Sequence, residues 1–309
     1  MKELERIEIY VDGLPIVAKC YNRKATLMVP ALLFKRFGAY VDLNEENESI
    51  IFQIGEKSFS LSINKDSKEA SYMNGNIYVP FLRVAKKLGM IVERSEHLIN
   101  INTPPTSCLP VLYKGETENK IVALTFDDGP DGYYTPKILD ILKEKNISAT
   151  FFIIGDQVKM FPNVVKRIQQ EGHAVGNHTW SHPNLFELTT TQLKNELQQT
   201  DEVIFSHTGI RTRLFRPPYG YYAKSDLQII DKLGYKVIMW SIDTVDWSGK
   251  SSEEIVLKVN MEESPGAIIL QHCFGAASGV LDGTVKALPV IIENLLEKGY
   301  EFVTMDQFV

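Results

Sequence analysis

The sequence is poor in cysteine: its 309 residues include only Cys20, Cys108 and Cys273, which lie far apart. An odd number of widely spaced cysteines excludes a disulfide framework, and no pair has the spacing of a zinc site. We expect three free thiols, mostly buried, with a Cys20–Cys108 bridge as the alternative. Cys273 directly follows His272, so its thiol is expected near any site built there, without a role in it.

Long hydrophobic runs are also absent. No stretch approaches the roughly 20 apolar residues that a membrane-spanning helix needs, so we expect no transmembrane segment. The chain starts Met-Lys-Glu-Leu-Glu-Arg-Ile-Glu, which is polar and acidic, and no secretory signal peptide is expected there. A processed protein would begin in the same way, so the sequence leaves the compartment open.

Positive charge is in deficit, with a net charge of −6. The deficit lies in residues 104–309, which carry 26 Asp and Glu against 19 Lys and Arg, whereas residues 1–103 are nearly balanced. Binding nucleic acid requires patches of Lys and Arg that neutralise phosphates. We therefore expect no nucleic acid partner. A neutral or partly cationic sugar polymer is compatible with this charge.

Residues 1–103 contain a weak internal repeat, in which residues 29–41 are similar to residues 79–92. In each copy a proline opens a helix, the apolar spacing that follows is helical, and a glycine closes the helix. A strand-like stretch follows each copy, and hairpin turns are expected upstream, at Asp12–Gly13 and Asn74–Gly75. These features predict a small α+β domain.

The repeat resembles copper amine oxidase N-terminal-like modules, which often occur on secreted bacterial proteins. Residues 1–103 hold one histidine, His97, and one cysteine, so no copper site is expected. We expect a binding or spacer module without chemistry.

Residues 104–119 are rich in proline and polar residues and predict a linker. We expect residues 120–309 to form a second domain.

From residue 120 onward, short apolar stretches alternate with amphipathic ones. We predict strands at 121–126, 148–154, 173–178, 213–217, 236–242, 266–272 and 301–304. We predict helices near 134–145, 161–171, 189–206, 224–233, 251–262 and 284–298. Several predicted helices end in a glycine, which supplies a left-handed cap. Repeated strand–helix units predict an α/β domain with a parallel sheet or barrel.

Polar or ionisable side chains stand at the ends of five predicted strands: Asp127, His178, Arg216, Asp243 and His272. In (β/α) barrels the carboxyl ends of the strands form the rim that holds the active site. We therefore expect these five residues to lie near one another.

The segments around these residues, 125–130, 178–182, 216–220, 243–247 and 270–272, resemble the five motifs of the polysaccharide deacetylases with a NodB homology domain, carbohydrate esterase family 4. The likeness runs from about residue 120 to residue 309, and the motifs occur in the same order. It implies a distorted (β/α) barrel of about seven strands. It also implies an enzyme that removes N-acetyl groups from sugars such as chitin or peptidoglycan glycans.

Asp128, His178 and His182 would form a two-histidine, one-carboxylate metal site. Histidines four apart on a helical turn face the same side. Three protein ligands leave a coordination position open, as a catalytic metal requires. The resemblance implies one divalent ion, zinc in the first place, with cobalt or another divalent ion also accepted. The same ligand trio suits non-haem iron oxygenases, but that interpretation leaves Asp127 unexplained.

Asp127 is the candidate general base, because it is a second carboxylate beside the metal site. Two usable neighbouring carboxylates imply that the strand breaks into its loop at this point, and Gly129-Pro130 provides the turn. Arg216 is the cation expected to pair with Asp127.

His272 is the candidate general acid, because deacetylation must protonate the departing amine. We expect Asp243 to pair with His272 and raise the pKa of the imidazole. The role of Asp246 is left open.

The resemblance implies further residues that shape the pocket. The backbone N–H of Tyr219 would hold the oxyanion of the reaction. Leu270 and Trp247 would bound a small apolar pocket for the acetyl methyl group, and Pro217 is assigned to substrate binding beside them.

The expected function is metal-dependent deacetylation of a glycan, either peptidoglycan N-acetylglucosamine or a chitin-like oligomer. The alternatives are deacetylation of N-acetylmuramic acid, a glycosidase with paired carboxylates, an inactive wall-binding protein, and an amidohydrolase of a small non-sugar amide. The resemblance implies a secreted or cell-wall associated protein, with a cytoplasmic location as the alternative. The oligomeric state is open, with a monomer favoured.

Overall fold

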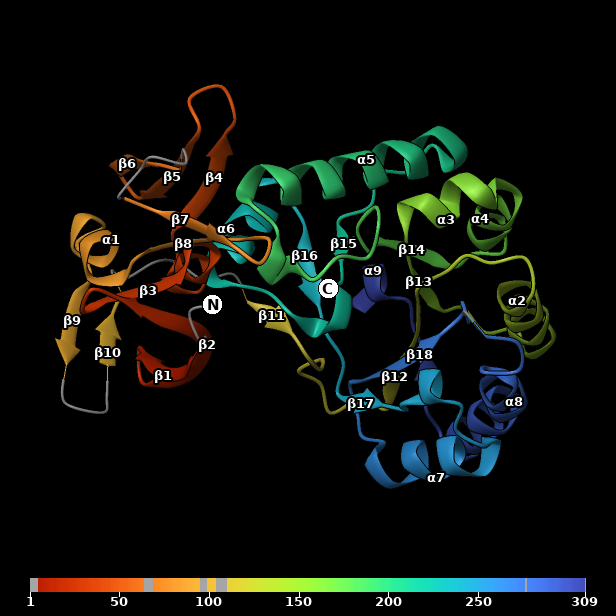
Figure 1. The fold of residues 1–309 in the computed structure, drawn as a ribbon. Coiled ribbons are helices and arrows are strands. Elements are labelled where there is room, and N and C mark those ends of the chain that lie inside the picture. The colour runs from red at the N-terminus through yellow and green to blue at the C-terminus, as the bar shows by residue number, and fades with distance from the viewer. Residues whose placement is uncertain (1–4, 64–68, 95–98, 104–109, 276, 309) are drawn as a thin grey trace. The chain divides into compact units, whose positions relative to one another are not determined.

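The computed structural model describes residues 5–63, 69–94, 99–103, 110–275 and 277–308 (Figure 1). The chain divides into two compact units, each described here by itself. The first contains Met1–Leu109 together with the segments Asn184–Lys194 and Tyr221–Ile229, and the second contains the rest. The first unit therefore includes two segments from the sequence of the expected catalytic domain.

The second unit is built on a sheet whose paired strands are all parallel, in the order β11-β16-β15-β14-β13-β12-β18-β17, with β19 also paired to β12. Its strands are β11 (Val111–Leu112), β12 (Ile121–Asp127), β13 (Thr150–Ile153), β14 (Ala174–Asn177), β15 (Leu214–Phe215), β16 (Lys236–Ile238), β17 (Ile242–Asp243), β18 (Ala267–His272) and β19 (Glu301–Phe302). Most residues of β12, β13 and β18 are buried, as expected for a parallel sheet covered on both faces.

This sheet is a distorted (β/α) barrel with one open seam. Strands β16 and β17 are separated by three residues, 239–241, but stand near opposite ends of the hydrogen-bonded order. No ladder joins them among the described residues, whereas β16 pairs with β15 and β17 pairs with β18. The predicted single strand 236–242 was wrong in this respect, because the chain crosses the seam there and must break its extended conformation.

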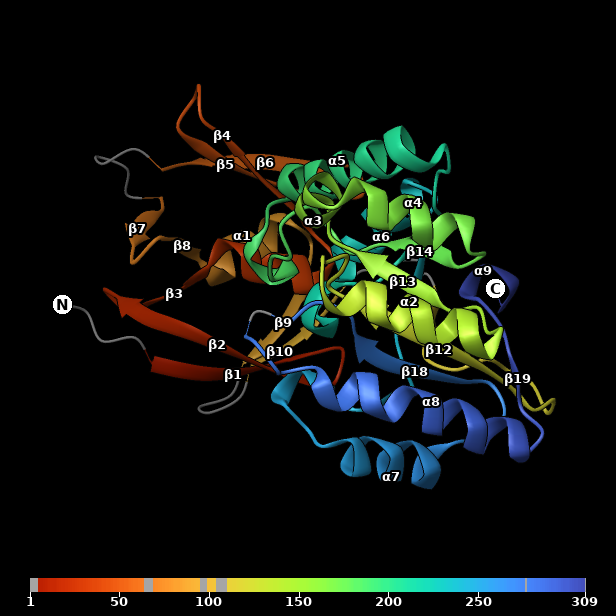
Figure 2. The same ribbon diagram turned by 90° about the vertical axis from the view of Figure 1, so that its right-hand side faces the viewer.

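Helices cover the outer face of the curled sheet (Figures 1 and 2). They are α2 (Tyr134–Lys145), α3 (Gly155–Met160), α4 (Pro162–Gln170), α5 (Thr190–Thr208), α7 (Ser252–Glu262) and α8 (Asp282–Glu297). Helix α9 (Met305–Phe308) lies on the other face of the sheet, where Met305 packs with Phe152 and Ile268. Apolar side chains of α2, α7 and α8 pack against those of β12, β13 and β18 to form the main core. Helix α7 begins with a capping box, in which Ser251 and Glu254 bond to each other's backbone N–H.

The six helices predicted after residue 120 are all present, and the remaining one is α6 (Lys224–Lys232). The first five residues of α5 and most of α6 belong to the first unit. Helix α2 begins and ends at the predicted residues. The short elements α3, α9 and β11 were not predicted. Strand β11 lies inside the expected linker, where two residues pair with β16.

The first unit contains a seven-stranded sheet in the order β7-β8-β3-β2-β1-β10-β9 and a three-stranded sheet β4-β5-β6. The strands are β1 (Glu5–Val11), β2 (Leu14–Arg23), β3 (Thr26–Pro30), β4 (Tyr40–Asn44), β5 (Ser49–Ile54), β6 (Lys57–Ser62), β7 (Ser71–Met73), β8 (Asn76–Pro80), β9 (Ile91–Arg94) and β10 (Ile99–Asn102). The hairpin turns predicted at Asp12–Gly13 and Asn74–Gly75 are confirmed.

The sequence repeat is also a structural repeat within this unit. In the first copy β3 leads into the 3₁₀ helix η1 (Ala31–Phe37), and in the second β8 leads into α1 (Phe81–Lys87). Both turns end on a glycine with positive φ, Gly38 and Gly89, whose N–H donates to the carbonyl of Lys35 or Lys86. The α+β character of this half is confirmed, while its role as a binding or spacer module stays a prediction.

Cys20 and Cys273 are free and buried, as predicted. Burial raises the pKa of the Cys20 thiol to about 12. Cys108 and His97 lie outside the described residues. None of the helices described is both long and apolar enough to cross a membrane.

Gly176 provides a test of the packing beneath the rim of the barrel. A Cβ at Gly176 would lie 2.3 Å from the Phe152 ring of the neighbouring strand. We expect Gly176→Ala to lower the free energy of unfolding by about 1–3 kcal/mol, because the buried ring must move. Combining it with Phe152→Leu should cost less than the sum of the two single changes. Additive losses in chemical denaturation would contradict this contact.

Candidate active site

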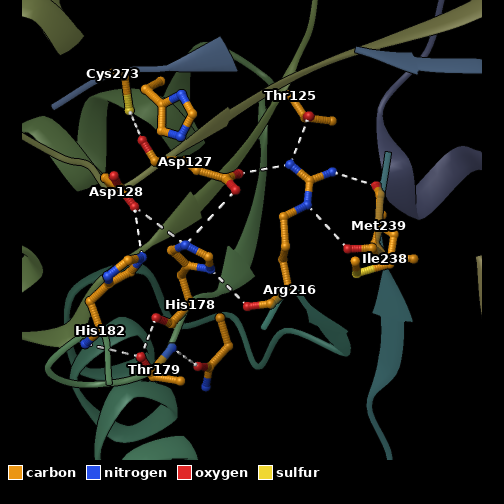
Figure 3. Close-up of polar contacts among 12 residues, drawn as sticks. Thr125, Asp127, Asp128, His178, Thr179, His182, Arg216, Ile238, Met239 and Cys273 are labelled. Carbon is orange, nitrogen blue, oxygen red and sulfur yellow. Dashed lines mark hydrogen bonds and ion pairs between the residues drawn. The ribbon is translucent and has the colours of Figure 1, made fainter. Parts of the chain in front are cut away.

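The two adjacent aspartates occupy different environments at the end of β12 (Figure 3). Asp127 is the last residue of the strand and is buried, with 3% of its surface exposed. Asp128 has left the strand, with φ 72°, and its side chain is 24% exposed. The prediction that the strand breaks at this pair is confirmed. Both carboxylates can therefore act in one site although their residues are neighbours in the chain.

The predicted histidine pair converges, but not on a helical turn. His178 follows β14, and the loop after it contains two left-handed residues, Thr179 at φ 70° and His182 at φ 57°. The Glu196 carboxylate, on α5, accepts the N–H groups of Trp180 and Ser181 and so holds the loop. The helical spacing argument was wrong, because tertiary hydrogen bonds set this backbone.

Asp128, His178 and His182 bring one potential ligand atom each within 4.8 Å of the others. Asp128 Oδ1 lies 3.3 Å from His178 Nε2 and 3.2 Å from His182 Nε2. Two ligands at about 2.0–2.1 Å in a tetrahedral arrangement are separated by about 3.3 Å, so these distances fit a zinc-like ion. Burial would raise the pKa of the Asp128 carboxyl, but the two imidazoles, which donate hydrogen bonds to it when Nε2 is protonated, hold that pKa well below its usual range.

The protonation of His178 supports a cation at this place. Its Nδ1 lies 2.7 Å from the backbone carbonyl oxygen of Arg216, which only accepts, so Nδ1–H donates. In a neutral ring Nε2 then presents a lone pair to the Asp128 oxygen. Two acceptors facing each other at 3.3 Å require a cation between them or a second proton on the ring. The side chains therefore fit a divalent metal.

Arg216 is completely buried and pairs with Asp127, as predicted (Figure 3). Its Nη1 lies 2.7 Å from Asp127 Oδ1 and 2.8 Å from Thr125 Oγ1. Its Nε and Nη2 donate to the carbonyls of Ile238 and Met239 at the end of β16. Burial lowers the pKa of the guanidinium, and the Asp127 charge opposes that shift. The second oxygen, Oδ2, lies 3.8 Å from His178 Nε2, beside the metal triad.

His272 is paired with Asp246, not with Asp243, which corrects the predicted pairing. The imidazole Nδ1 lies 2.7 Å from Asp246 Oδ1, and Asp246 Oδ2 accepts both the His272 N–H and the Thr284 hydroxyl. Burial alone would lower the pKa of His272, but the hydrogen bond and charge of Asp246 raise it to about 9. His272 also stands opposite Asp127 in the register of β12 and β18.

Asp243 takes a different place, because Val245 has φ 54° and the chain turns into a 3₁₀ helix, η4 (Asp246–Ser248). That turn brings Asp246, with no surface exposed, toward His272. Asp243, at the end of β17, instead accepts the N–H of Val245 at 2.9 Å. The catalytic role predicted for Asp243 stays a prediction, and Asp246 and Thr284 are the residues that sequence reasoning did not assign.

The other predicted residues lie on the same rim. Tyr219, in the turn η3 (Pro218–Gly220), has φ 59° and its ring is 4.6 Å from the His182 ring. Pro217 and Leu270 are buried, and Trp247 is 58% exposed. Their roles in the oxyanion hole and the acetyl pocket stay predictions.

A cleft of about 270 Å³ opens at Asp128. The residues that line it are Asp128, Ile154, Asp156, Gln157, Ser181, His182 and Phe274. Asp156 is exposed, so it adds a carboxylate at this cleft.

Cys273 lies behind the site, where its N–H donates to the Asp127 carbonyl. Burial raises the pKa of its thiol well above the ordinary value, which makes it unreactive, as expected.

The Asp246–His272 pair predicts a titration shift that Asp243 does not control. In Asp246→Asn the charge opposite Nδ1 is lost, so the His272 pKa should fall from about 9 to its ordinary value or below, because burial remains. NMR titration of the metal-free protein measures this shift. Asp243→Asn is the matched control, three residues earlier in the same segment, and should leave the titration unchanged. The reverse pattern would contradict the pairing.

Comparison with known proteins agrees with this geometry. The family profile described as polysaccharide deacetylase matches residues 114–238. A peptidoglycan-N-acetylglucosamine deacetylase of Bacillus cereus is 44% identical over 193 residues, 62% of this chain and 70% of the relative. A peptidoglycan-N-acetylglucosamine deacetylase of Listeria monocytogenes is 39% identical over 75% of this chain, which spans 48% of that relative. The peptidoglycan-N-acetylmuramic acid deacetylase PdaA of Bacillus subtilis is 36% identical over 64% of this chain.

Solved structures extend the likeness. A peptidoglycan N-acetylglucosamine deacetylase is similar with a TM-score of 0.62 and 42% identity, over 64% of this chain and 92% of that chain. A mutant of a family 4 pseudoenzyme with restored enzymatic activity is similar with a TM-score of 0.61 and 25% identity, over 90% of this chain and 97% of that chain. The resemblance of the first half to copper amine oxidase modules stays a prediction. The chain belongs to the polysaccharide deacetylase family, carbohydrate esterase family 4.

Proposed function

We propose that the protein is a metal-dependent N-deacetylase of a glycan and releases acetate. The observation that carries this proposal is the free carboxylate of Asp127 beside the triad of Asp128, His178 and His182. A hydrolytic site of this kind needs a position for the metal and a separate base for water. Asp127 is held by Arg216 through Oδ1 and keeps Oδ2 beside the triad, which suits a base and not a fourth metal ligand.

Zinc is the proposed ion, because two imidazoles and one carboxylate suit it, with cobalt or another divalent ion as substitutes. When bound, it would polarise the amide carbonyl and lower the pKa of a water molecule. Asp127 takes a proton from the attacking water as the water oxygen bonds to the amide carbon, and Arg216 keeps the Asp127 carboxylate oriented. The N–H of Tyr219 donates to the carbonyl oxygen as negative charge develops there.

His272 completes the reaction by donating a proton to the departing amine nitrogen. The pKa of about 9 means that the imidazole is protonated at neutral pH and able to act as an acid. Asp246 holds the imidazole through Nδ1, so Nε2–H is the proton available for transfer. The amide C–N bond breaks as the proton reaches nitrogen, and the products are acetate and a free amino sugar.

The rival functions explain fewer of these features. A glycosidase uses paired carboxylates but has no use for the two histidines. A non-haem iron oxygenase uses the triad but not Asp127 or the Asp246–His272 pair. An inactive wall-binding protein is disfavoured because it would have no use for Asp127, His272 and the triad on one rim of the barrel. A small-amide hydrolase remains the nearest alternative chemistry.

The substrate we propose is the N-acetylglucosamine of peptidoglycan, with chitin-like oligomers and N-acetylmuramic acid as alternatives. Relatives named as N-acetylglucosamine deacetylases are 44%, 39% and 36% identical, and relatives named as N-acetylmuramic acid deacetylases are 36% and 35% identical. The cleft points the same way, because its described lining residues include Asp156 but no lysine or arginine to receive the lactyl carboxylate of muramic acid. Such a substrate places the protein at the cell wall, and we propose that it acts there as a monomer.

Asp127→Asn should reduce turnover by about 10²–10⁴-fold while the divalent ion still binds, because only the base is lost. Acetate release and calorimetric metal titration measure the two properties separately. Asp128→Asn is the matched comparison and should lose both. If Asp127→Asn keeps its rate, Asp127 is not the base.

The substrate proposal predicts faster acetate release from N-acetylglucosamine oligomers than from glycans whose only N-acetyl groups are on muramic acid residues with a free lactyl carboxylate. Asp156→Asn should narrow the difference, because the repulsion of the lactyl carboxylate is removed. Equal rates on both substrates in the wild-type protein, or a preference for muramic acid, would overturn this assignment.

A further inference from the structure

Two segments of the catalytic sequence belong to the first unit and begin directly after residues of the proposed site. The segment Asn184–Lys194 starts two residues after the metal ligand His182, and Tyr221–Ile229 starts two residues after Tyr219. The conformation of each segment therefore restrains, through the chain, the loop that carries a site residue. What holds the segments in place is consequently relevant to the site.

Lys35 is bonded to both segments at once. It lies on η1 and has no exposed surface. Its Nζ lies 2.7 Å from the carbonyl oxygens of both Leu185 and Leu188 in the first segment. Asp226 Oδ1, in the second segment, is 2.8 Å away and is also completely buried. The ammonium group thus donates to two carbonyl oxygens and forms an ion pair with the Asp226 carboxylate.

The burial of this ammonium group sets Lys35 apart from its counterpart in the repeat. Lys86 occupies the same place relative to the closing glycine in the second copy, and its side chain is exposed. Lysine is almost never fully buried unless it is paired, because desolvation of the charge is costly. At Lys35 that cost is offset by three acceptors which converge from two segments distant in the sequence.

Other contacts within the first unit hold the same two segments. The guanidinium of Arg36 lies 3.8 Å from the centre of the Phe186 ring, and that ring stacks on Tyr221 at 5.6 Å. The N–H of Thr191 donates to Asp42 Oδ1 at 2.7 Å. The anchoring is thus distributed, with Lys35 as its one buried charge that reaches both segments.

We propose that Lys35 is a positioning residue of the active site, which fixes the chain after His182 and after Tyr219 by anchoring both following segments. This inference rests on the proposed function, because it assigns the first unit a part in holding the metal ligand and the oxyanion donor. The N-terminal half is then required for the site to form and is more than a spacer.

The test compares the full-length wild-type protein with Lys35→Met/Asp226→Asn. The double change removes the ammonium group without leaving a buried unpaired carboxylate, and asparagine keeps the oxygen that accepts the Ala223 N–H. We expect the dissociation constant for Co²⁺, followed by calorimetry, to rise about tenfold, as for loss of supporting groups around a metal site. Hydrogen exchange should become faster in 184–194 and 221–229. Acetate release should recover at saturating metal.

Two control variants separate positioning from general destabilisation. Lys86→Met changes the exposed counterpart and should leave Co²⁺ binding unchanged. Met28→Ala opens a cavity in the first unit, in a cluster with Tyr21 and Tyr78, and should lower the melting temperature without weakening Co²⁺ binding. If Met28→Ala weakens Co²⁺ binding as much as the double variant does, the inference is overturned.

The remaining outcomes are also decisive. If the wild-type protein binds Co²⁺ and releases acetate, and the double variant binds Co²⁺ equally well, the inference about Lys35 is overturned. The proposed function is not affected by that result. Wild-type protein that binds no Co²⁺ overturns the proposed function and this inference with it. If the double variant does not fold, Asp42→Ala removes only the acceptor of the Thr191 N–H. It should then raise the Co²⁺ dissociation constant by about threefold, and an unchanged value overturns the inference.

Discussion

The guanidinium of Arg216 is completely buried, and its hydrogen-bond partners offset the cost of burying its charge. It donates to Asp127, the proposed base, while the backbone carbonyl of Arg216 accepts from Nδ1–H of His178, a proposed metal ligand. The Arg216 guanidinium also donates to two backbone carbonyls at the end of β16. The chain crosses the open seam of the barrel there, and within the described part of the chain β16 is not hydrogen-bonded to β17 on the other side of the seam. Because an unpaired buried charge is costly, these contacts must form together or not at all. The positions of Asp127, of His178 and of the chain at the seam therefore depend on the ion pair between Arg216 and Asp127.

Much of this arrangement could be predicted from the sequence, because it follows from local patterns. Alternating strands and helices predict a parallel sheet, and parallel strands bring their carboxyl ends to one edge. Asp127, Arg216 and His272 each stand at such an end, and so they meet although up to 145 residues separate them. The triad of Asp128, His178 and His182 could be predicted for the same reason, from residue type and position at strand ends.

The predictions were wrong where tertiary contacts determine the backbone conformation. Asp243 and Asp246 are both carboxylates near the same strand end, and the spacing does not tell which one faces His272. The left-handed Val245 reverses the chain between them and turns Asp246 inward. The histidine loop is similar, because Glu196 on a distant helix holds it in a non-helical form. Strand 236–242 splits for a comparable reason, since the seam of the barrel lies within it.

Lys35 and Lys86 show most clearly that local sequence does not predict the burial of a side chain. Both carry the same charge and stand three residues before the closing glycine of one repeat, Lys35 on a 3₁₀ helix and Lys86 on an α-helix. One is exposed, and the other is enclosed by acceptors from segments about 150 and 190 residues further along the chain. Burial of a lysine is stable only where such acceptors are already ordered, so it constrains the segments as much as they constrain it. A repeat that looks like a detachable module can therefore be part of the frame of a distant catalytic site.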